Sequence, residues 1–455
     1  MTTNVCVFEN WHFAYFRYKA RYVMRTFLPQ KQHQIPEFDA NIAGGTQVGK
    51  RTVDISGKMK VLRKLADESE NPDGTHSIIL QHILPTTIEY IDIVNSVYPV
   101  DLVISIVYSN DQPTVDALRA KGYEVIVPNS IEYMKEELWK DVLRVLDGAS
   151  HPVVFQEVGG YMSKWTKQLS QYEGFKGCVE DTKNGLWRYQ EAEKNGDIHL
   201  PVLSMADTAL KRVEDSLIGD ACVYSLEKVL RTQLASILDG LRCGVIGWGN
   251  IGKSCATAIE GRNSVVSVYD INPVVNMLGY GRGFYPMPLA QLLAESDVVM
   301  GCSGRRSIRT ADIHDIKNGA LLCSASSKDI EIDLKGFSQL CEIEDITPQG
   351  DDLCPIEKYT VKKTGKVFYI LKHGTPIDFL DMPLQGAILD CTFSELFVCM
   401  RELSKNPHSP GVIELADALQ IEVAKLWLPT YVETFSTHEA TKDKTFFFPE
   451  SWYWE

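Results

Sequence analysis

Three glycines spaced G-x-G-x-x-G lie within the stretch CGVIGWGNIG, at residues 243–252. A short apolar run leads into them, and the segment that follows, NIGKSCATAIEG, has the character of a helix. A strand, a tight turn and a helix in this order present backbone N–H groups to a pyrophosphate, and the glycines allow the turn and the close approach. The sequence therefore predicts a dinucleotide site. Its expected contacts within the turn are Gly247, Gly249, Asn250, Ile251 and Gly252.

A second apolar run, residues 265–269, ends in Asp270, about 20 residues beyond the glycines. A carboxylate in this place accepts a hydrogen bond from a ribose 2′-hydroxyl and repels a 2′-phosphate. The motif therefore favours NAD over NADP as the cofactor. An empty fold of the same topology is the alternative.

Lys211 and Asp215 stand four residues apart in the segment MADTALKRVEDSLIG, residues 205–219. On a helix this spacing places both side chains on one face. The simplest interpretation is an exposed ion pair worth about 0.3 kcal/mol. The alternative is a lysine whose pKa falls through burial, so that it exchanges a proton with a substrate hydroxyl. The residue pattern alone leaves both open.

The elements that would position these residues alternate along the chain. A first set of strand-like runs occupies residues 77–82, 102–107, 123–128 and 152–157, and a second set occupies 243–247, 265–270, 297–302 and 320–325. Helical periodicity fills the gaps, for instance over residues 131–146, and a hairpin is predicted at 359–371. This rhythm predicts an α/β protein with two doubly wound, Rossmann-like domains. Because ligands bind beyond the carboxyl ends of parallel strands, His82 and Glu157 at two strand ends are candidate site residues.

The two strand sets suggest a division of the chain into three parts. We expect a substrate-binding domain at 1–221, an NAD-binding Rossmann domain at 222–378, and a C-terminal segment at 379–455. That last segment contains a predicted helix at 384–403 and ends in an aromatic tail. The functional site is expected in the cleft between the two domains.

Composition and charge narrow the functional classes. The net charge of −14 argues against a nucleic-acid partner, because no basic stretch offsets it. No apolar segment approaches the roughly 18 residues that span a bilayer, and the N-terminus lacks the pattern of a signal peptide. The 11 cysteines show no metal-ligand spacing. We expect buried free thiols, a cytoplasmic location, no metal site and no membrane partner.

Several motifs in the same order resemble the S-adenosyl-L-homocysteine hydrolase family, from about residue 77 to about residue 400. The family's D-D-G-G-D corresponds to EVGGY at 157–161, and its E-E-T-T-T-G corresponds to EDTKNG at 180–185. The K-x-x-x-D motif is present as Lys211 to Asp215. The cofactor fingerprint G-Y-G-x-V-G-K-G corresponds to GWGNIGKS, followed by DINP in place of E-I-D-P.

The resemblance implies a redox-neutral use of NAD. Family members oxidise the 3′-hydroxyl of a nucleoside, which acidifies the 4′ proton so that the 5′ substituent is eliminated and water is added, and the ketone is then reduced. By resemblance, Lys211 and Asp215 would act at the 3′-hydroxyl, Asp181 would hold the ribose, and His82 would serve near the leaving group. Glu157 is the nearest candidate for the acidic motif. Thr182 falls on a cofactor-contacting threonine, and Ser303 and Asp378 complete the expected cofactor contacts.

Departures from the family pattern leave the substrate open. Val158 stands where the family has its acid/base aspartate, Ala206 replaces an asparagine and Ser327 replaces a histidine. On the adenine side, Leu84 and Thr86 replace a threonine and a glutamate. We therefore expect a nucleoside or nucleoside thioether other than S-adenosylhomocysteine. A divergent adenosylhomocysteinase and a catalytically silent NAD-binding regulator or scaffold are the alternatives.

The aromatic tail, Phe446 to Trp454, is too apolar to remain exposed to water. We expect it to pack on a second subunit near the cofactor, as family tails do, giving a homo-oligomer. Docking of the tail on its own domain is the alternative.

Overall fold

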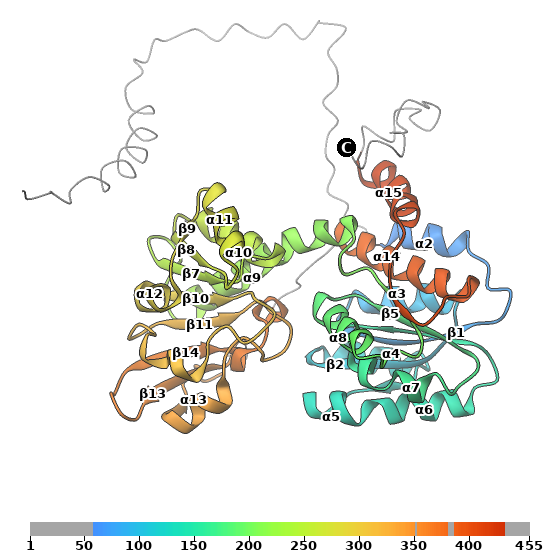
Figure 1. Cartoon of the computed structure of the whole chain (residues 1–455), viewed down its shortest axis with the longest axis horizontal. Coiled ribbons are helices and arrows are strands. Elements are labelled where there is room, and N and C mark those ends of the chain that lie inside the picture. Colours follow the sequence, from blue (N-terminus) through green and yellow to red (C-terminus); the bar gives the residue numbers. More distant parts are fainter. Residues whose placement is uncertain (1–57, 351–352, 381–385, 433–455) are drawn as a thin grey trace, which may run out of the picture. The chain divides into compact units, whose positions relative to one another are not determined.

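The computed structural model describes residues 58–350, 353–380 and 386–432 (Figure 1). All of these residues belong to one compact unit, Arg51–Glu455. The predicted aromatic tail at 446–454 lies outside the described residues. Within the described part, no helix combines the length and apolar character that crossing a membrane requires.

The first sheet has seven strands in the order β15-β6-β5-β4-β1-β2-β3, and its neighbouring strands are parallel. The strands are β1 (His76–Ile83), β2 (Val100–Asn110), β3 (Val125–Ile126), β4 (Val153–Glu157), β5 (Phe175–Glu180), β6 (Pro201–Ser204) and β15 (Gly411–Glu414). Successive side chains of β1 enter different apolar clusters: Ile78 and Leu80 pack in one, and Ile79 packs in another. Both faces of the strand are thus buried, as in parallel sheets covered by helices on both sides.

The second sheet has eight strands in the order β12-β13-β14-β11-β10-β7-β8-β9. The strands are β7 (Arg242–Ile246), β8 (Val265–Tyr269), β9 (Tyr285–Pro286), β10 (Val298–Gly301), β11 (Leu321–Ser324), β12 (Cys341–Asp345), β13 (Ile356–Val361) and β14 (Val367–Leu371). Six neighbouring strands pair in parallel, in the order β14-β11-β10-β7-β8-β9. At the β14 edge, β13 and β12 extend the sheet by antiparallel pairing.

Helices follow most strands and cover the sheets (Figure 1). They are α2 (Lys60–Asp67), α3 (Thr87–Asn95), α4 (Gln112–Ala120), α5 (Ile131–Glu136), α6 (Leu138–Gly148), α7 (Thr166–Leu169), α8 (Lys183–Lys194), α9 (Ala209–Thr232), α10 (Asn250–Glu260), α11 (Pro273–Gly281), α12 (Leu289–Glu295), α13 (Leu334–Leu340), α14 (Gly386–Lys405) and α15 (Asp417–Tyr431). The buried carboxylate of Asp390 in α14 accepts hydrogen bonds from the backbone N–H groups of Val61 and Leu62, at 2.8 and 3.0 Å. It thereby satisfies free N–H groups in the first turn of α2.

The predicted α/β class with two Rossmann-like sheets is confirmed. The predicted helix at 131–146 is divided at Glu137, whose backbone (φ −120°) leaves the helical region. The predicted strand at 123–128 pairs over only two residues, Val125–Ile126. The sequence interpretation missed β5, β6 and β15. In β5 the apolar signal is interrupted by Gly177, which has a φ of +132°, and β6 and β15 have only four residues each.

Candidate active site

A cavity of about 1070 Å³ lies beyond the carboxyl ends of strands from both sheets. Most of the predicted site residues line it: His82, Asp181, Thr182, Lys211, Asp215, Gly247, Gly249, Asn250, Ile251, Asp270, Ser303 and Asp378. Two predicted residues, Glu157 and Gly252, are not in its lining. This location agrees with the general position of ligands in open α/β sheets. The individual roles of these residues stay predictions.

The glycine turn between β7 and α10 has the close packing that its spacing implies. Gly247 has a φ of +99°, and a Cβ on it would lie 2.7 Å from the backbone of Ser303. A Cβ on Gly252 would lie 1.9 Å from the carbonyl oxygen of Gly247. Gly249, the N-cap residue of α10, has open space around its own Cβ position. The turn is therefore packed against the protein on one side and leaves room for a ligand at the start of α10.

Asp270 connects the end of β8 to this turn. Its carboxylate accepts hydrogen bonds from the backbone N–H of Trp248 at 2.8 Å and from that of Asn272 at 2.9 Å. These bonds fix the carboxylate at the cavity wall, where its remaining lone pairs can accept a ribose hydroxyl.

Asp378 offers a second acceptor in the cavity lining. Its side chain is buried, and within the described part of the chain its Oδ1 atom has no hydrogen-bond partner. Burial raises the pKa of Asp378 to about 6. An unpartnered buried carboxylate oxygen costs free energy unless a ligand donates to it. The glycine turn, Asp270 and Asp378 together fit a bound dinucleotide.

Lys211 lies in the first turn of α9, where its backbone N–H donates to the hydroxyl of the N-cap residue, Thr208. Its ammonium group donates to Asp181 Oδ1 at 2.7 Å and to Glu214 Oε2 at 2.5 Å. Burial acts to lower the pKa of Lys211, but the carboxylates of Asp181, Glu214 and Asp215 outweigh it and raise the pKa well above its ordinary value. The ammonium group is therefore charged at neutral pH.

The exposed ion pair and the lowered lysine pKa expected from the Lys211–Asp215 spacing are thus wrong, whereas the role of these residues at a substrate hydroxyl stays a prediction. Lys211 is only 8% exposed and pairs with Asp181 and Glu214, so the exposed ion pair with Asp215 does not form. Its pKa also does not fall, because three carboxylates surround it. Asp215 instead accepts a hydrogen bond from the side chain of Asn250 at 3.0 Å, which joins α9 to the cofactor turn.

His82 stands at the end of β1 and lines the cavity. Its Nδ1 atom forms a hydrogen bond with the hydroxyl of Ser109, and its ring stacks on Phe379 with centroids 4.5 Å apart. Burial lowers the pKa of His82 to about 4. At neutral pH this imidazole is therefore uncharged.

Glu157 is not brought to the cavity. It is fully buried, accepts a hydrogen bond from the backbone N–H of Tyr161 at 2.7 Å, and accepts another from the hydroxyl of Tyr189. Burial raises the pKa of Glu157 to about 7. Its neighbour Val158 packs in an apolar cluster and is also absent from the cavity lining. In the described structure, neither residue of this motif presents an acid or base to the cavity.

Sequence reasoning missed three charged residues near the site. Glu214 lines the cavity and completes the cluster with Lys211 and Asp181; its spacing of three residues from Lys211 was a usable signal. Glu331 is buried and accepts hydrogen bonds from three serine hydroxyls, so it shapes the loop after β10; the donors are Ser303, Ser307 and Ser326. Lys328 is buried, and its ammonium group lies 4.2 Å from the ring centre of Tyr161. No local pattern marks Glu331 or Lys328.

Comparison with known proteins finds similarity to one enzyme family. The family model described as "S-adenosyl-L-homocysteine hydrolase, NAD binding domain" matches residues 220–377. Adenosylhomocysteinase from Thermotoga maritima is 25% identical over 388 residues, which cover 82% of this chain and 92% of that protein. Both matches show similarity to the S-adenosyl-L-homocysteine hydrolase family. The match to an NAD-binding domain supports NAD as the cofactor, as predicted.

Solved structures match the chain at low sequence identity. A phosphoglycerate oxidoreductase from Vibrio cholerae matches with a TM-score of 0.37 and 14% identity, covering 58% of this chain and 79% of that one. The TT0316 protein from Thermus thermophilus matches with a TM-score of 0.38 and 14% identity, covering 73% of this chain and 99% of that one. Likeness at this level carries no argument about function.

Proposed function

We propose that the protein is an NAD-dependent enzyme of the adenosylhomocysteinase type that acts on a nucleoside or nucleoside thioether through a transient 3′-ketone. We further propose that its substrate differs from S-adenosylhomocysteine. The observation that carries the proposal is the cluster of Lys211, Asp181 and Glu214, which lines the same cavity as the glycine turn. Similarity to the Thermotoga maritima adenosylhomocysteinase supports the reaction type.

The cluster of Lys211, Asp181 and Glu214 can accept a proton from a ribose hydroxyl and stabilise the charge left on its oxygen. Bound NAD supplies a hydride acceptor and, at the end of the cycle, a hydride donor. Lys211 stays charged, so its part is to donate a hydrogen bond to the 3′-oxygen and stabilise negative charge there. The proton acceptor is then a neighbouring carboxylate, Asp181 or Glu214. Burial raises the pKa of Glu214, which brings this carboxylate closer to the range of an effective general base.

The side chains available for the elimination step and for adenine binding are less suited to S-adenosylhomocysteine. The uncharged His82 can accept a proton at the cavity wall, but its pKa of about 4 makes it a poor base at neutral pH. Val158 cannot move the 4′ proton, and loss of general acid/base help costs typically about 10²–10⁴ in rate. Leu84 and Thr86 line the cavity where the family resemblance implies the adenine side. Loss of a charged acceptor there costs about 1.5–3 kcal/mol, or roughly ten- to a hundredfold in affinity.

The test mixes the purified full-length protein with adenosine, S-adenosylhomocysteine and other nucleosides, and follows NADH absorbance and thiol release separately. We expect NADH to form with at least one nucleoside, and S-adenosylhomocysteine to release homocysteine slowly. Lys211→Ala should abolish the NADH signal. Lys164→Ala is the matched control, because Lys164 forms an exposed ion pair with Glu136 outside the cavity. Rapid homocysteine release would contradict the substrate proposal and favour an authentic adenosylhomocysteinase.

A second candidate function is a catalytically silent NAD-binding regulator. The observation that favours it is that two carboxylates already engage the ammonium group of Lys211, together with the burial of Glu157 away from the cavity. In that case no nucleoside would give an NADH signal, and Lys211→Ala would leave NAD content unchanged.

We propose a homo-oligomer in the cytoplasm with a small-molecule nucleoside-type substrate. The cysteines support a reducing compartment: all ten in the described part of the chain are buried, and no disulfide joins any two of them. We also propose the division into domains at 1–221, 222–378 and 379–455. The parallel pairing of β15 with β6 and the packing of Phe397 of α14 in the same cluster as Ile79 of β1 support the return of the last segment to the first sheet.

A further inference from the structure

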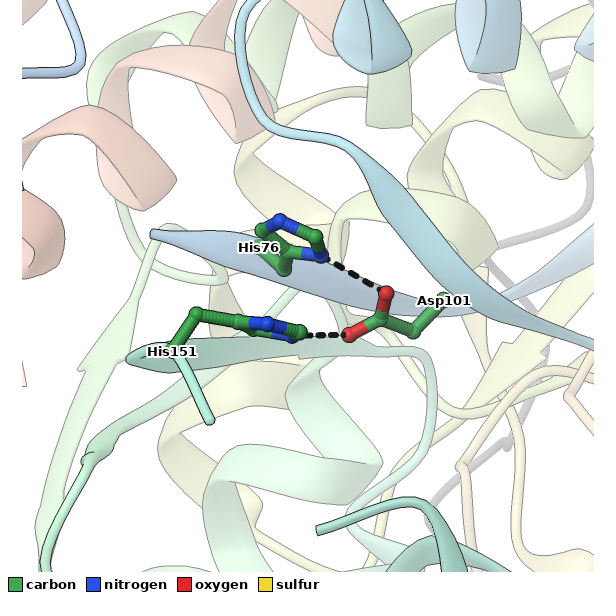
Figure 2. Close-up of side chains that lie close together, drawn as sticks. All are labelled: His76, Asp101 and His151. Carbon is green, nitrogen blue, oxygen red and sulfur yellow. Dashed lines mark hydrogen bonds and ion pairs between the residues drawn. The ribbon is translucent and has the colours of Figure 1, made fainter. Parts of the chain in front are cut away.

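Two histidines and one aspartate meet at the amino end of the first sheet (Figure 2). None of the three lines the cavity. His76 is the first residue of β1, Asp101 is the second residue of β2, and His151 stands two residues before β4. Asp101 lies against both rings. Its Oδ1 is 2.7 Å from Nδ1 of His76, and its Oδ2 is 2.8 Å from Nε2 of His151.

The backbone holds this group in place. β1 lies between β2 and β4 in the sheet and pairs in parallel with both. The backbone N–H of His76 donates to the carbonyl of Pro152, and that of Ser77 donates to the carbonyl of Pro99, each at 2.8 Å. The three side chains therefore project from neighbouring strands whose register is fixed by hydrogen bonds. They are separated from His82, at the other end of β1, by about 20 Å of extended chain.

The ligand set and its geometry suit a transition-metal ion. Two imidazoles and a carboxylate are a common ligand set for Zn²⁺, which binds nitrogen at about 2.0–2.1 Å and oxygen at about 2.0–2.2 Å. One ligand atom from each of the three side chains lies within 4.8 Å of the others, a separation at which the three could hold one ion. The side chains of His76, Asp101 and His151 are 26%, 20% and 25% exposed, which leaves access for an ion and water.

The two imidazole rings lie side by side next to the carboxylate. They are stacked with centroids 3.4 Å apart and an interplanar angle of 21°. Each ring has one nitrogen at hydrogen-bond distance from an oxygen of Asp101, 2.7 Å for His76 and 2.8 Å for His151. Neutral imidazole nitrogens and a carboxylate thus gather at one point, as metal ligation requires.

We propose that His76, Asp101 and His151 form a Zn²⁺ site in which water occupies the fourth position. The ion would join the amino ends of β1, β2 and β4 and stabilise the first sheet. This site is independent of the proposed reaction, because its ligands lie at the opposite end of β1 from the cavity-lining His82.

The test uses the full-length protein after removal of metals with a chelator. Titration with Zn²⁺ should bind one ion per chain and raise the melting temperature. Co²⁺ should give the visible absorption of a tetrahedral site. His76→Gln and His151→Gln should each weaken binding at least roughly tenfold, since loss of even an outer-shell partner costs about 10–100-fold. His408→Gln is the matched control, because His408 pairs with a single carboxylate, Glu402, at 3.2 Å.

A further variant tests ligation directly. In His151→Cys, Co²⁺ should produce a thiolate-to-metal charge-transfer band in the near ultraviolet that the natural protein lacks. A merely structural role for His151 would not generate such a band. Equal Zn²⁺ affinity in the natural protein, His76→Gln and His151→Gln would overturn the proposal. So would the absence of any Zn²⁺ effect on the melting temperature of the natural protein.

Discussion

Lys211 and Asp181 form a buried ion pair, with Lys211 Nζ 2.7 Å from Asp181 Oδ1 and each side chain 10% exposed. Asp181 follows β5 directly, whereas Lys211 belongs to α9. This helix connects β6 of the first sheet to β7 of the second sheet. The pair therefore fixes the start of this connecting helix against the carboxyl end of the first sheet. It also places an ammonium group at the cavity wall.

Removal of Lys211 should destabilise the fold as well as stop turnover. In Lys211→Met, Asp181 and Glu214 are left as buried like charges, and breaking a buried pair costs about 3–5 kcal/mol. Glu214→Gln should recover part of that loss when combined with Lys211→Met, because one of the two unpaired charges is gone. Urea unfolding of the single and double variants measures the coupling. Strict additivity of the two changes would contradict a shared ion cluster.

Two glycines of the turn should have different roles, Gly252 in packing and Gly249 in cofactor binding. In Gly252→Ala the new Cβ meets the carbonyl oxygen of Gly247 at 1.9 Å, so we expect a loss of about 1–3 kcal/mol in stability. In Gly249→Ala the Cβ has open space, and we expect unchanged stability but weaker NAD binding, because the methyl group occupies space at the start of α10. Thermal unfolding without ligand and NAD titration by calorimetry distinguish the two. Full NAD affinity in Gly249→Ala would count against cofactor binding at this turn.

The protein should purify with NAD rather than NADP. Asp270 stands at the cavity wall with its carboxylate fixed by two backbone N–H groups. Asp270→Ser should weaken NAD binding by roughly ten- to a hundredfold, the cost of losing a hydrogen bond to a charged group, and should reduce the discrimination against NADP. Mass spectrometry of molecules released on denaturation identifies the bound cofactor. Release of NADP from the natural protein would refute this prediction.

The buried Lys328 should make stability depend on pH. Burial lowers the pKa of Lys328 to about 7, with a further decrease from Arg188 and Lys135 that Glu180 and Glu157 partly oppose. An unfolded lysine has a pKa near 10.5, so between about pH 7 and pH 10.5 the unfolded chain binds more protons than the folded one. The contribution of Lys328 is therefore least favourable below pH 7 and improves as the pH rises through this window.

Lys328→Met removes that penalty. We expect it to raise the free energy of unfolding by a few kcal/mol at pH 6, because each tenfold change in an acid dissociation constant corresponds to about 1.4 kcal/mol, and to give a smaller gain at pH 9. Chemical denaturation across this pH range measures the difference. Lys164→Met, at an exposed lysine, is the control and should show no such trend. A gain that stays constant with pH would mean that Lys328 does not titrate in this window.

The contiguous motifs were readable from the sequence because their physics is local. The glycine spacing and Asp270 lie within one strand–turn–helix–strand unit, so the chain itself brings them together. The alternation of apolar strands and amphipathic helices likewise determined the α/β class. The sequence also carried the motif order that matches the S-adenosyl-L-homocysteine hydrolase family.

Tertiary structure alone decided which groups meet across elements. Helical spacing predicted a pair between Lys211 and Asp215. In the fold, Lys211 instead forms ion pairs with Asp181 and Glu214. Asp215 accepts a hydrogen bond from the side chain of Asn250. A strand-end position made Glu157 a candidate, yet hydrogen bonds from the neighbouring backbone and a tyrosine hold it away from the cavity.

The His76–Asp101–His151 group is another contact between elements that sequence spacing does not predict. Asp101 is 25 residues from His76 and 50 residues from His151, so no local spacing marked a metal site and none was expected. Parallel pairing of β1 with β2 and β4 brings the amino ends of these strands to one edge. Local pattern reports periodicity along a chain, whereas such a site depends on strand order, which is determined by the packing of the whole sheet.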